Sequence, residues 1–198
     1  MLTVVMPSFH SSHLIEERIK EIDIEIPIVI IENSRNYELK KKIEDKYKNT
    51  QIIIPNENLG FGRASNLGLK LSKTQMVFLT QPDVKLIDNC ISKLVECTKK
   101  FKDFTIISPV DLNNKFYTNY EIYKSYPPIS NENKFLLKEV DYVDLTWLIN
   151  KENLDVDTYW DENIFLYFEA LDFAKRIKDK NKKIFVADGI NTYHLGAS

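Results

Sequence analysis

The sequence predicts an α/β fold with a mostly parallel central sheet, and three observations support this prediction. Short β-rich runs alternate with stretches of helical periodicity through the first half of the chain. The strand-like runs are apolar on both faces, as in parallel sheets that helices cover on both sides. The length of 198 residues and the hydrophobic content of 43% suit one domain with an ordinary core. We therefore expect residues 1–198 to form a single domain.

The first two strand–helix pairs follow from the spacing of apolar residues. Residues 2–6 (LTVVM) form a continuous apolar run typical of a buried strand, which Pro7 ends. Apolar residues at helical spacing follow over 14–22. Residues 26–31 (IPIVII) form a second run rich in β-branched residues, and the charged stretch 38–47 predicts a second helix.

The next two pairs repeat this order. Residues 51–54 predict a third strand, and the loop NENLGFG leads from it into a helix over 63–71. Residues 76–80 (MVFLT) predict a fourth strand. That strand ends in the turn Gln81-Pro82-Asp83, before a helix over 88–100.

The pattern is looser in the second half of the chain. After a short apolar run at 106–109, residues 111–137 are rich in Tyr and Asn and predict a long loop or a small hairpin. Order is expected again over 140–149, then in a helix over 168–180 and a strand over 184–187.

Composition excludes several classes of protein. The net charge of −2 and the pI of about 6.0 argue against a basic protein that coats nucleic acid. Cys90 and Cys97 lie seven positions apart in one expected helix, too far for a disulfide, so we expect reduced thiols. Neither a signal peptide nor an apolar run of membrane-spanning length is present. We expect a cytoplasmic protein, and its charge argues against strong electrostatic attachment to an anionic membrane.

Four polar clusters stand at predicted strand ends, at 7–9, 32–34, 58–66 and 81–83. The carboxyl ends of parallel strands meet at one edge of a sheet, where ligands gather. The cluster at 58–66 also contains glycines before a helix, which allow close backbone approach and favour an anion at the helix start. It matches neither the Walker A loop nor G-x-G-x-x-G. Each cluster taken alone is typical of an ordinary turn, whereas the four together predict a site for a polar ligand.

Five strings of the sequence, in the correct order, resemble motifs of family-two glycosyltransferases. The string NLGFGRASNLG resembles the N-x-G-F-x-x-A-x-N-x-G element, particularly that of the rhamnosyltransferase-like branch. The other strings extend the resemblance along nearly the whole chain, and they are VVMPSFH, IVIIENS, FLTQPDV, YWDENIFLYFEALDFAKR and the closing YHLGAS.

The resemblance implies a GT-A fold, a nucleoside-diphosphate sugar donor, a divalent cation (Mg²⁺ or Mn²⁺) and inversion at the anomeric carbon. Asp83 is the implied carboxylate ligand and His194 the implied second ligand, because hard cations take oxygen ligands and a diphosphate supplies the others. The residue-level alternatives are a turn cap for Asp83 and an ordinary C-terminal position for His194. The chain would end soon after the closing motif, as a minimal transferase or one that stops with its catalytic core.

The implied donor site has two groups of residues. Pro7, Ser8, Phe9, Glu32 and Ser34 would contact the nucleoside, and the family usually has Asp where this chain has Glu32. Asn58, Gly60, Arg63 and Asn66 would line the remainder of the donor site beside Asp83. Arg63 is either a diphosphate partner or a solvated residue of the first helical turn.

The catalytic base departs from the family pattern. The family has Glu-Asp and usually assigns the Asp as base, whereas this chain has Glu169-Ala170. Glu169 and Asp172 share a helix face and either could take the proton, although Asp172 could also pair with Arg176. A second departure is Leu145, where the family usually has Gly and where a bulky side chain would narrow or fill the acceptor pocket.

The resemblance therefore implies an inverting transferase that moves a sugar onto a glycan or lipid-linked acceptor. Rhamnosyl transfer in cell-surface polysaccharide synthesis is its more specific form, with the enzyme at the inner face of the cytoplasmic membrane as one location. The alternative is a catalytically impaired GT-A-like domain that binds nucleotide or sugar, and Ala170 is the residue that supports it.

Overall fold

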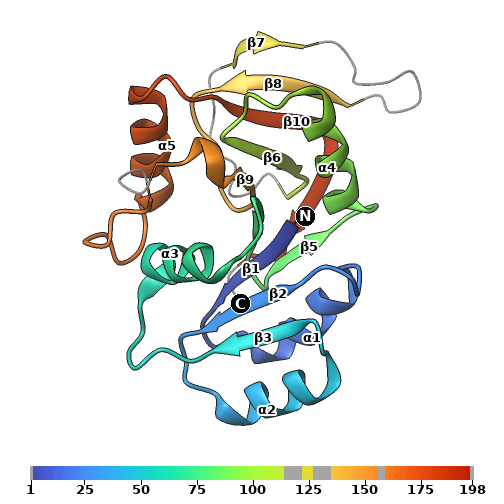
Figure 1. The fold of residues 1–198 in the computed structure, drawn as a ribbon, viewed down its shortest axis with the longest axis vertical. Coiled ribbons are helices and arrows are strands. Elements are labelled where there is room, and N and C mark those ends of the chain that lie inside the picture. The colour runs from blue at the N-terminus through green and yellow to red at the C-terminus, as the bar shows by residue number, and fades with distance from the viewer. Residues whose placement is uncertain (1, 114–121, 127–134, 156–158, 197–198) are drawn as a thin grey trace.

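The computed structural model describes residues 2–113, 122–126, 135–155 and 159–196 (Figure 1). Its strands are β1 (Leu2–Ser8), β2 (Ile28–Glu32), β3 (Thr50–Ile53), β4 (Met76–Leu79), β5 (Val84–Leu86), β6 (Ile106–Asp111), β7 (Ile122–Ser125), β8 (Leu136–Val140), β9 (Trp147–Asn150) and β10 (Ile184–His194). Its helices are α1 (Ser12–Lys20), α2 (Tyr37–Lys46), α3 (Gly60–Leu71), α4 (Cys90–Lys100), α5 (Glu169–Asp179) and a 3-10 turn at Lys151–Asn153.

The strands form one sheet in the order β3-β2-β1-β4-β9-β6-β10-β8-β7, with β5 on the end of β10. The α/β prediction is confirmed, but the sheet is mixed rather than mostly parallel. β1 to β4 are parallel, while β9 runs antiparallel between β4 and β6, and β8 runs antiparallel to β10. Parallel neighbours need a long crossover, usually a helix, and in the second half several strands follow one another without one.

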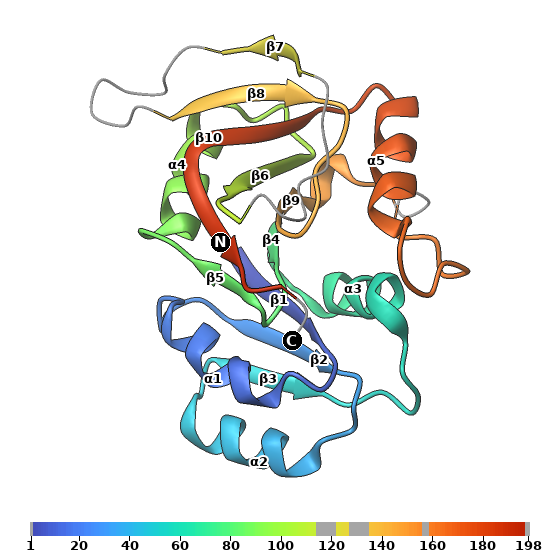
Figure 2. The ribbon, with the colours of Figure 1, turned by 180° about the vertical axis from the view of Figure 1, so that it is seen from behind.

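Several boundaries differ from those predicted. The helix expected over 63–71 begins at Gly60, and the strand expected over 184–187 continues to His194. The continuation pairs with β5, a three-residue strand that the sequence pattern did not predict (Figure 2). So short a strand carries too little periodicity to be seen without its partner. Part of the expected loop at 111–137 forms β7 and β8, and its other residues lie largely outside the described ones.

Helices cover both faces of the sheet, with α1 and α4 on one side and α3 and α5 on the other (Figure 1). Successive side chains of a strand point to opposite faces of the sheet. Val4 therefore packs on the face that α1 and α4 cover, and Val5 packs on the face that α3 and α5 cover. Cys90 and Cys97 are buried, unbonded thiols as predicted, and burial raises the pKa of each to about 12. None of the helices in the described part of the chain has the length and apolar character needed to cross a bilayer.

Candidate functional site

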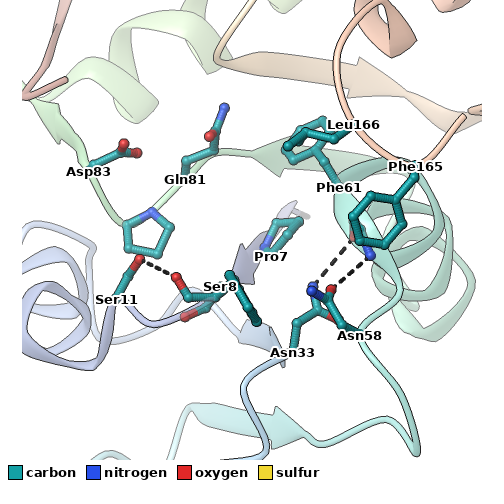
Figure 3. A pocket seen from close by; sticks show the side chains of 13 residues that line it. Pro7, Ser8, Ser11, Asn33, Asn58, Phe61, Gln81, Asp83, Phe165 and Leu166 are labelled. Carbon is teal, nitrogen blue, oxygen red and sulfur yellow. Dashed lines mark hydrogen bonds between the residues drawn. The ribbon is translucent and has the colours of Figure 1, made fainter. Parts of the chain in front are cut away.

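A cavity of about 280 Å³ lies at the carboxyl ends of β1 and β4, beside the start of α3 (Figure 3). Five segments distant in sequence form its walls. The lining residues are Pro7, Ser8, Phe9, Ser11, Asn33, Asn58, Gly60, Phe61, Gln81, Pro82, Asp83, Phe165 and Leu166. Of the predicted site residues, the cavity thus brings together Pro7, Ser8, Phe9, Asn58, Gly60 and Asp83. Strand ends and helix starts converge there, as expected for an α/β sheet.

Glu32 and Ser8 carry buried oxygen atoms that lack a hydrogen-bond partner among the described residues. The two residues are paired across β1 and β2. Glu32 is fully buried, and its Oε1 accepts hydrogen bonds from the backbone N–H and the hydroxyl of Ser34. Its Oε2, like the Oγ of Ser8, has no described partner. Buried polar atoms are rarely left unpaired in proteins. Ser8 lines the cavity, whereas Glu32 and Ser34 lie beside it and are not among its lining residues.

The glycines of the 58–68 string make room for the chain itself. Gly60 has a φ of +70°, and a Cβ there would lie 2.2 Å from the backbone oxygen of Phe165. A Cβ on Gly62 would lie 3.1 Å from Trp160. Two asparagine side chains hold this turn. The side-chain oxygen of Asn58 accepts a hydrogen bond from the backbone N–H of Gly60 (2.9 Å), and that of Asn33 accepts one from the backbone N–H of Leu59 (3.1 Å). The close approach predicted from these glycines is therefore made by protein backbone and by Trp160.

Arg63 and Asn66 do not reach the cavity. The guanidinium of Arg63 pairs with Glu57 (2.7 Å) on the surface, which is the solvated first-turn arrangement. Asn66 is buried and forms two hydrogen bonds with the backbone of Trp160, one through its amide NH₂ (2.8 Å) and one through its oxygen (3.0 Å). Asn66 thus fixes the segment that leads to Phe165, and this segment forms one wall of the cavity.

Phe165 and Leu166 are lining residues that the sequence did not single out. Both are about half exposed, and they stand in the segment between Trp160 and α5. Both belong to the string YWDENIFLYFEALDFAKR, in which the resemblance to the family implied roles for carboxylates only. The two residues that follow, Tyr167 and Phe168, both have positive φ values of 65°. This reversal of the backbone directs the chain into α5.

Asp83 and His194 come together at the edge of the cavity, although 111 positions separate them in sequence. Asp83 follows β4, His194 ends β10, and the pairing of β5 with β10 brings them close. The Nε2 atom of His194 lies 3.1 Å from Oδ2 of Asp83. This hydrogen bond raises the pKa of the imidazole, and the negative charges of Asp111 and Asp144 add to the effect while burial opposes it. The carboxylate of Asp83 is therefore aimed at His194.

Two further carboxylates that the sequence did not single out surround His194. Asp111 ends β6, is 5% exposed, and accepts a hydrogen bond from the backbone N–H of His194 (2.7 Å). Asp144 precedes β9 and accepts from the Tyr142 hydroxyl (2.9 Å) and from Leu145 N (2.7 Å). Among the described residues, no three His, Cys, Asp or Glu side chains lie close enough to hold a metal ion by themselves.

The two candidate bases lie in different surroundings. Asp172 forms an ion pair with Arg176, whose Nη2 and Nε lie 2.6 and 2.8 Å from its Oδ2. Glu169 begins α5, and its Oε2 is buried without a partner among the described residues. Burial raises the pKa of Glu169, and the charge of Asp144 raises it further. Ala170, which stands where the family has its aspartate, is buried in the core. The carboxylate next to it in the chain is that of Glu169.

Asp144→Asn is expected to lower the pKa of Glu169, because a nearby negative charge disfavours ionisation of the carboxyl group. The pKa should stay above its ordinary value, since burial is the larger cause and remains. Titration of the Glu169 carboxyl carbon by NMR measures the change. Asp179→Asn, at the far end of α5, is the matched control and should leave this pKa unchanged. An identical Glu169 titration in Asp144→Asn would show that the two carboxyl groups do not interact.

Leu145→Gly is expected to raise the free energy of unfolding by about 1 kcal/mol, because a non-glycine residue in the left-handed region is strained. Leu145 has a φ of +68°, so the backbone there has the conformation that glycine favours. Its side chain is not among those that line the cavity. Urea denaturation measures the effect. Leu145→Ala, which shortens the side chain but keeps the Cβ, should show no gain, and a gain equal to that of glycine would exclude backbone strain as the cause.

Comparison with known proteins gives one family and several distant relatives. Residues 3–161 match the model of the family described as glycosyl transferase family 2. The low-salt glycan biosynthesis hexosyltransferase Agl10 of Haloferax volcanii is 21% identical over 98% of this chain and 66% of its own length.

Solved structures show the same fold. The TarS 1–349 structure from S. aureus has a TM-score of 0.73 and 16% identity, over 97% of this chain and 59% of its own. The mannosyltransferase PcManGT from Pyrobaculum calidifontis, in complex with GDP-Man and Mn²⁺, has a TM-score of 0.74 and 14% identity, over 100% and 57%. This chain thus spans less than two thirds of each of these three proteins.

Proposed function

Because this chain belongs to glycosyltransferase family 2, we propose that it transfers a sugar, with inversion, from a nucleoside-diphosphate donor to a hydroxyl group of a glycan or lipid-linked acceptor. The observation that carries the proposal is the cavity at the carboxyl ends of β1 and β4, with Asp83 and its partner His194 at its edge. Nucleotide ligands bind at this position in α/β sheets.

The nucleoside would occupy the end of the cavity formed by Pro7, Ser8 and Phe9. The unpaired oxygens of Ser8 and Glu32 would accept hydrogen bonds from the base or the ribose. Ser34 would act indirectly, because its N–H and hydroxyl are already used to hold the Glu32 carboxylate. Asn58 and Gly60 would shape the adjoining wall, and Asn66 would support it from outside the cavity, whereas Arg63 pairs with Glu57 on the surface.

Asp83 and His194 fit a divalent cation of the Mg²⁺ or Mn²⁺ type. A carboxylate and an imidazole supply two ligands, and a cation bound with a nucleotide needs few more from the protein. PcManGT, which has the same fold, was solved with Mn²⁺ and its sugar nucleotide. Such a cation, when bound, stabilises the negative charge that develops on the departing nucleoside diphosphate.

Glu169 is the proposed base. The acceptor oxygen attacks the anomeric carbon, the bond to the diphosphate breaks, and the carboxylate of Glu169 takes the proton from the acceptor hydroxyl. Its raised pKa makes its ionised form a better proton acceptor than an exposed glutamate. Asp172 is less suited to this role because Arg176 already binds its carboxylate.

The proposed donor carries a hexose, in the broad sense that includes deoxyhexoses such as rhamnose. The curated relative is named as a hexosyltransferase, while the rhamnosyltransferase-like branch has only the resemblance of the 58–68 string in its favour. A place in cell-surface polysaccharide synthesis, at the inner face of the cytoplasmic membrane, is the corresponding proposal for the cellular role.

The alternative function is a GT-A-like domain that binds a sugar nucleotide without transferring the sugar. The observation in its favour is Ala170, which places a methyl group in the core where the family has its base. A panel of UDP-, GDP- and dTDP-sugars, each with Mn²⁺ and with saccharide acceptors or water, separates the two. Turnover of one donor supports the transferase, whereas saturable nucleotide binding without any turnover supports the binding domain.

A further inference from the structure

We propose that Asp111 is a positioning residue of the cation site, which holds His194 through its backbone and supplies negative charge that favours a divalent cation beside Asp83. The proposal rests on the proposed function, since it concerns the same cation. It adds a residue that neither the motifs nor the comparisons assign.

The first support is the set of contacts around His194. β6 and β10 run in parallel and bring Asp111 opposite Thr192, two residues before His194. Oδ1 of Asp111 accepts a hydrogen bond from the backbone N–H of His194 at 2.7 Å. The side chain of Asn113 donates to the carbonyl oxygen of His194 at 2.6 Å. The end of β6 therefore binds both backbone polar groups of His194 and fixes the place from which its imidazole meets Asp83.

The second support is the buried charge of Asp111. Asp111 is only 5% exposed, and its Oδ2 atom has no hydrogen-bond partner among the described residues. No Lys or Arg of the described residues forms an ion pair with it. Burying a carboxylate without a compensating positive group is unfavourable. A divalent cation at Asp83 and His194 would provide that compensation.

The third support is that two carboxylates, those of Asp83 and Asp111, both contact His194. Asp83 Oδ2 lies 3.1 Å from Nε2 of the ring, and Asp111 Oδ1 binds the backbone N–H of the same residue. A second carboxylate beside His194 adds to the negative potential there, which attracts a cation more strongly than Asp83 and His194 would alone. Groups that orient and charge metal ligands in this way commonly change metal affinity 10- to 100-fold.

Asp111→Asn tests the proposal, because the amide oxygen can still accept from His194 N while the charge is lost. Binding of Mn²⁺ alone is measured from the loss of the free Mn²⁺ signal in electron paramagnetic resonance. We expect the Kd for Mn²⁺ to rise tenfold or more. The melting temperature without metal should stay the same or rise, since an uncompensated buried charge is removed. A merely structural role for Asp111 would predict the opposite pattern, with lower stability and unchanged Mn²⁺ affinity.

Asp188→Asn is the matched control, because it removes a charge from β10, the strand that ends at His194, at a residue that pairs with Lys138. It should leave the Kd for Mn²⁺ within threefold of the unsubstituted protein. Asp111→Ser, which keeps a small acceptor without charge, carries the same expectation if the Asn variant does not fold. Equal Mn²⁺ affinity in Asp111→Asn and the unsubstituted protein would overturn the role of Asp111 and leave the proposed transferase intact. Failure of the unsubstituted protein to bind Mn²⁺ would overturn the cation site itself, and this inference with it.

Discussion

Glu169→Gln is expected to reduce sugar transfer by about 10²- to 10⁴-fold, the usual contribution of a general base. Glutamine keeps the size and one acceptor oxygen of the side chain but cannot take up the proton of the acceptor hydroxyl. Donor binding should be unchanged, because Glu169 does not line the cavity. Steady-state kinetics with the donor identified in the panel measures kcat, and nucleotide titration measures the binding.

Stability gives a second readout of the same substitution. Folding raises the pKa of Glu169, so the protein is destabilised by this ionised group once the pH exceeds the unfolded pKa, and the penalty is relieved as pH falls. Glutamine removes the penalty, and the free energy of unfolding at pH 7 should therefore not decrease. Asp172→Asn is the matched control, expected to lose the pair with Arg176 and to change kcat less than tenfold. A larger loss in Asp172→Asn than in Glu169→Gln would assign the base to Asp172.

Asp83→Asn is expected to reduce transfer by about 10²-fold or more, comparable to the loss of one group that stabilises charge in a transition state. The amide is a weaker ligand for a hard cation than the carboxylate. The Mn²⁺ concentration needed for half-maximal activity should rise as well. Activity measured over a range of Mn²⁺ concentrations separates this effect from a change in donor binding.

The same substitution should lower the pKa of His194, since the hydrogen bond to Asp83 is the largest cause that raises it. A histidine with a raised pKa stabilises the folded state below its unfolded pKa and loses that contribution as the pH rises through its folded value. The loss of stability in Asp83→Asn should thus be larger at pH 6 than at pH 9. Histidine NMR titration and urea denaturation at both pH values measure these effects. An unchanged His194 titration would show that the contact with Asp83 is absent in solution.

Much of the fold was predictable because it depends on local patterns. The first strands have continuous apolar runs, and α1 to α4 have helical spacing, so their order and approximate bounds agree with the structure. β5 and the end of β10 were not predictable, because β5 is a strand only through pairing with β10, and the end of β10 is one only through pairing with β5 and β6. The direction of β9 was not predictable either, since the pattern of a four-residue strand does not indicate which strands it will pair with.

The candidate site was predictable in part, for a related reason. Pro7, Ser8, Phe9 and Asp83 stand directly at strand ends, and the rule that such ends converge brought them together correctly. Asn66 belongs to the 58–68 string that implied a donor site, yet its side-chain amide binds the backbone of Trp160 instead. Asp111 and Asp144 carried no recognisable motif and became relevant only through their proximity to His194.

The sequence by itself determined the α/β class, the alternation of strands and helices, and the identity of the residues at the first strand ends, because periodicity and turn chemistry are local properties. Tertiary structure alone decided that the sheet is mixed, that the glycines before α3 make room for Phe165 and Trp160, and that Asp172 pairs while Glu169 remains without a partner at Oε2. It also brought Asp83, Asp111 and His194 together from three different strand ends. Such contacts join residues far apart in the chain, and they exist only once the sheet has placed its strands side by side.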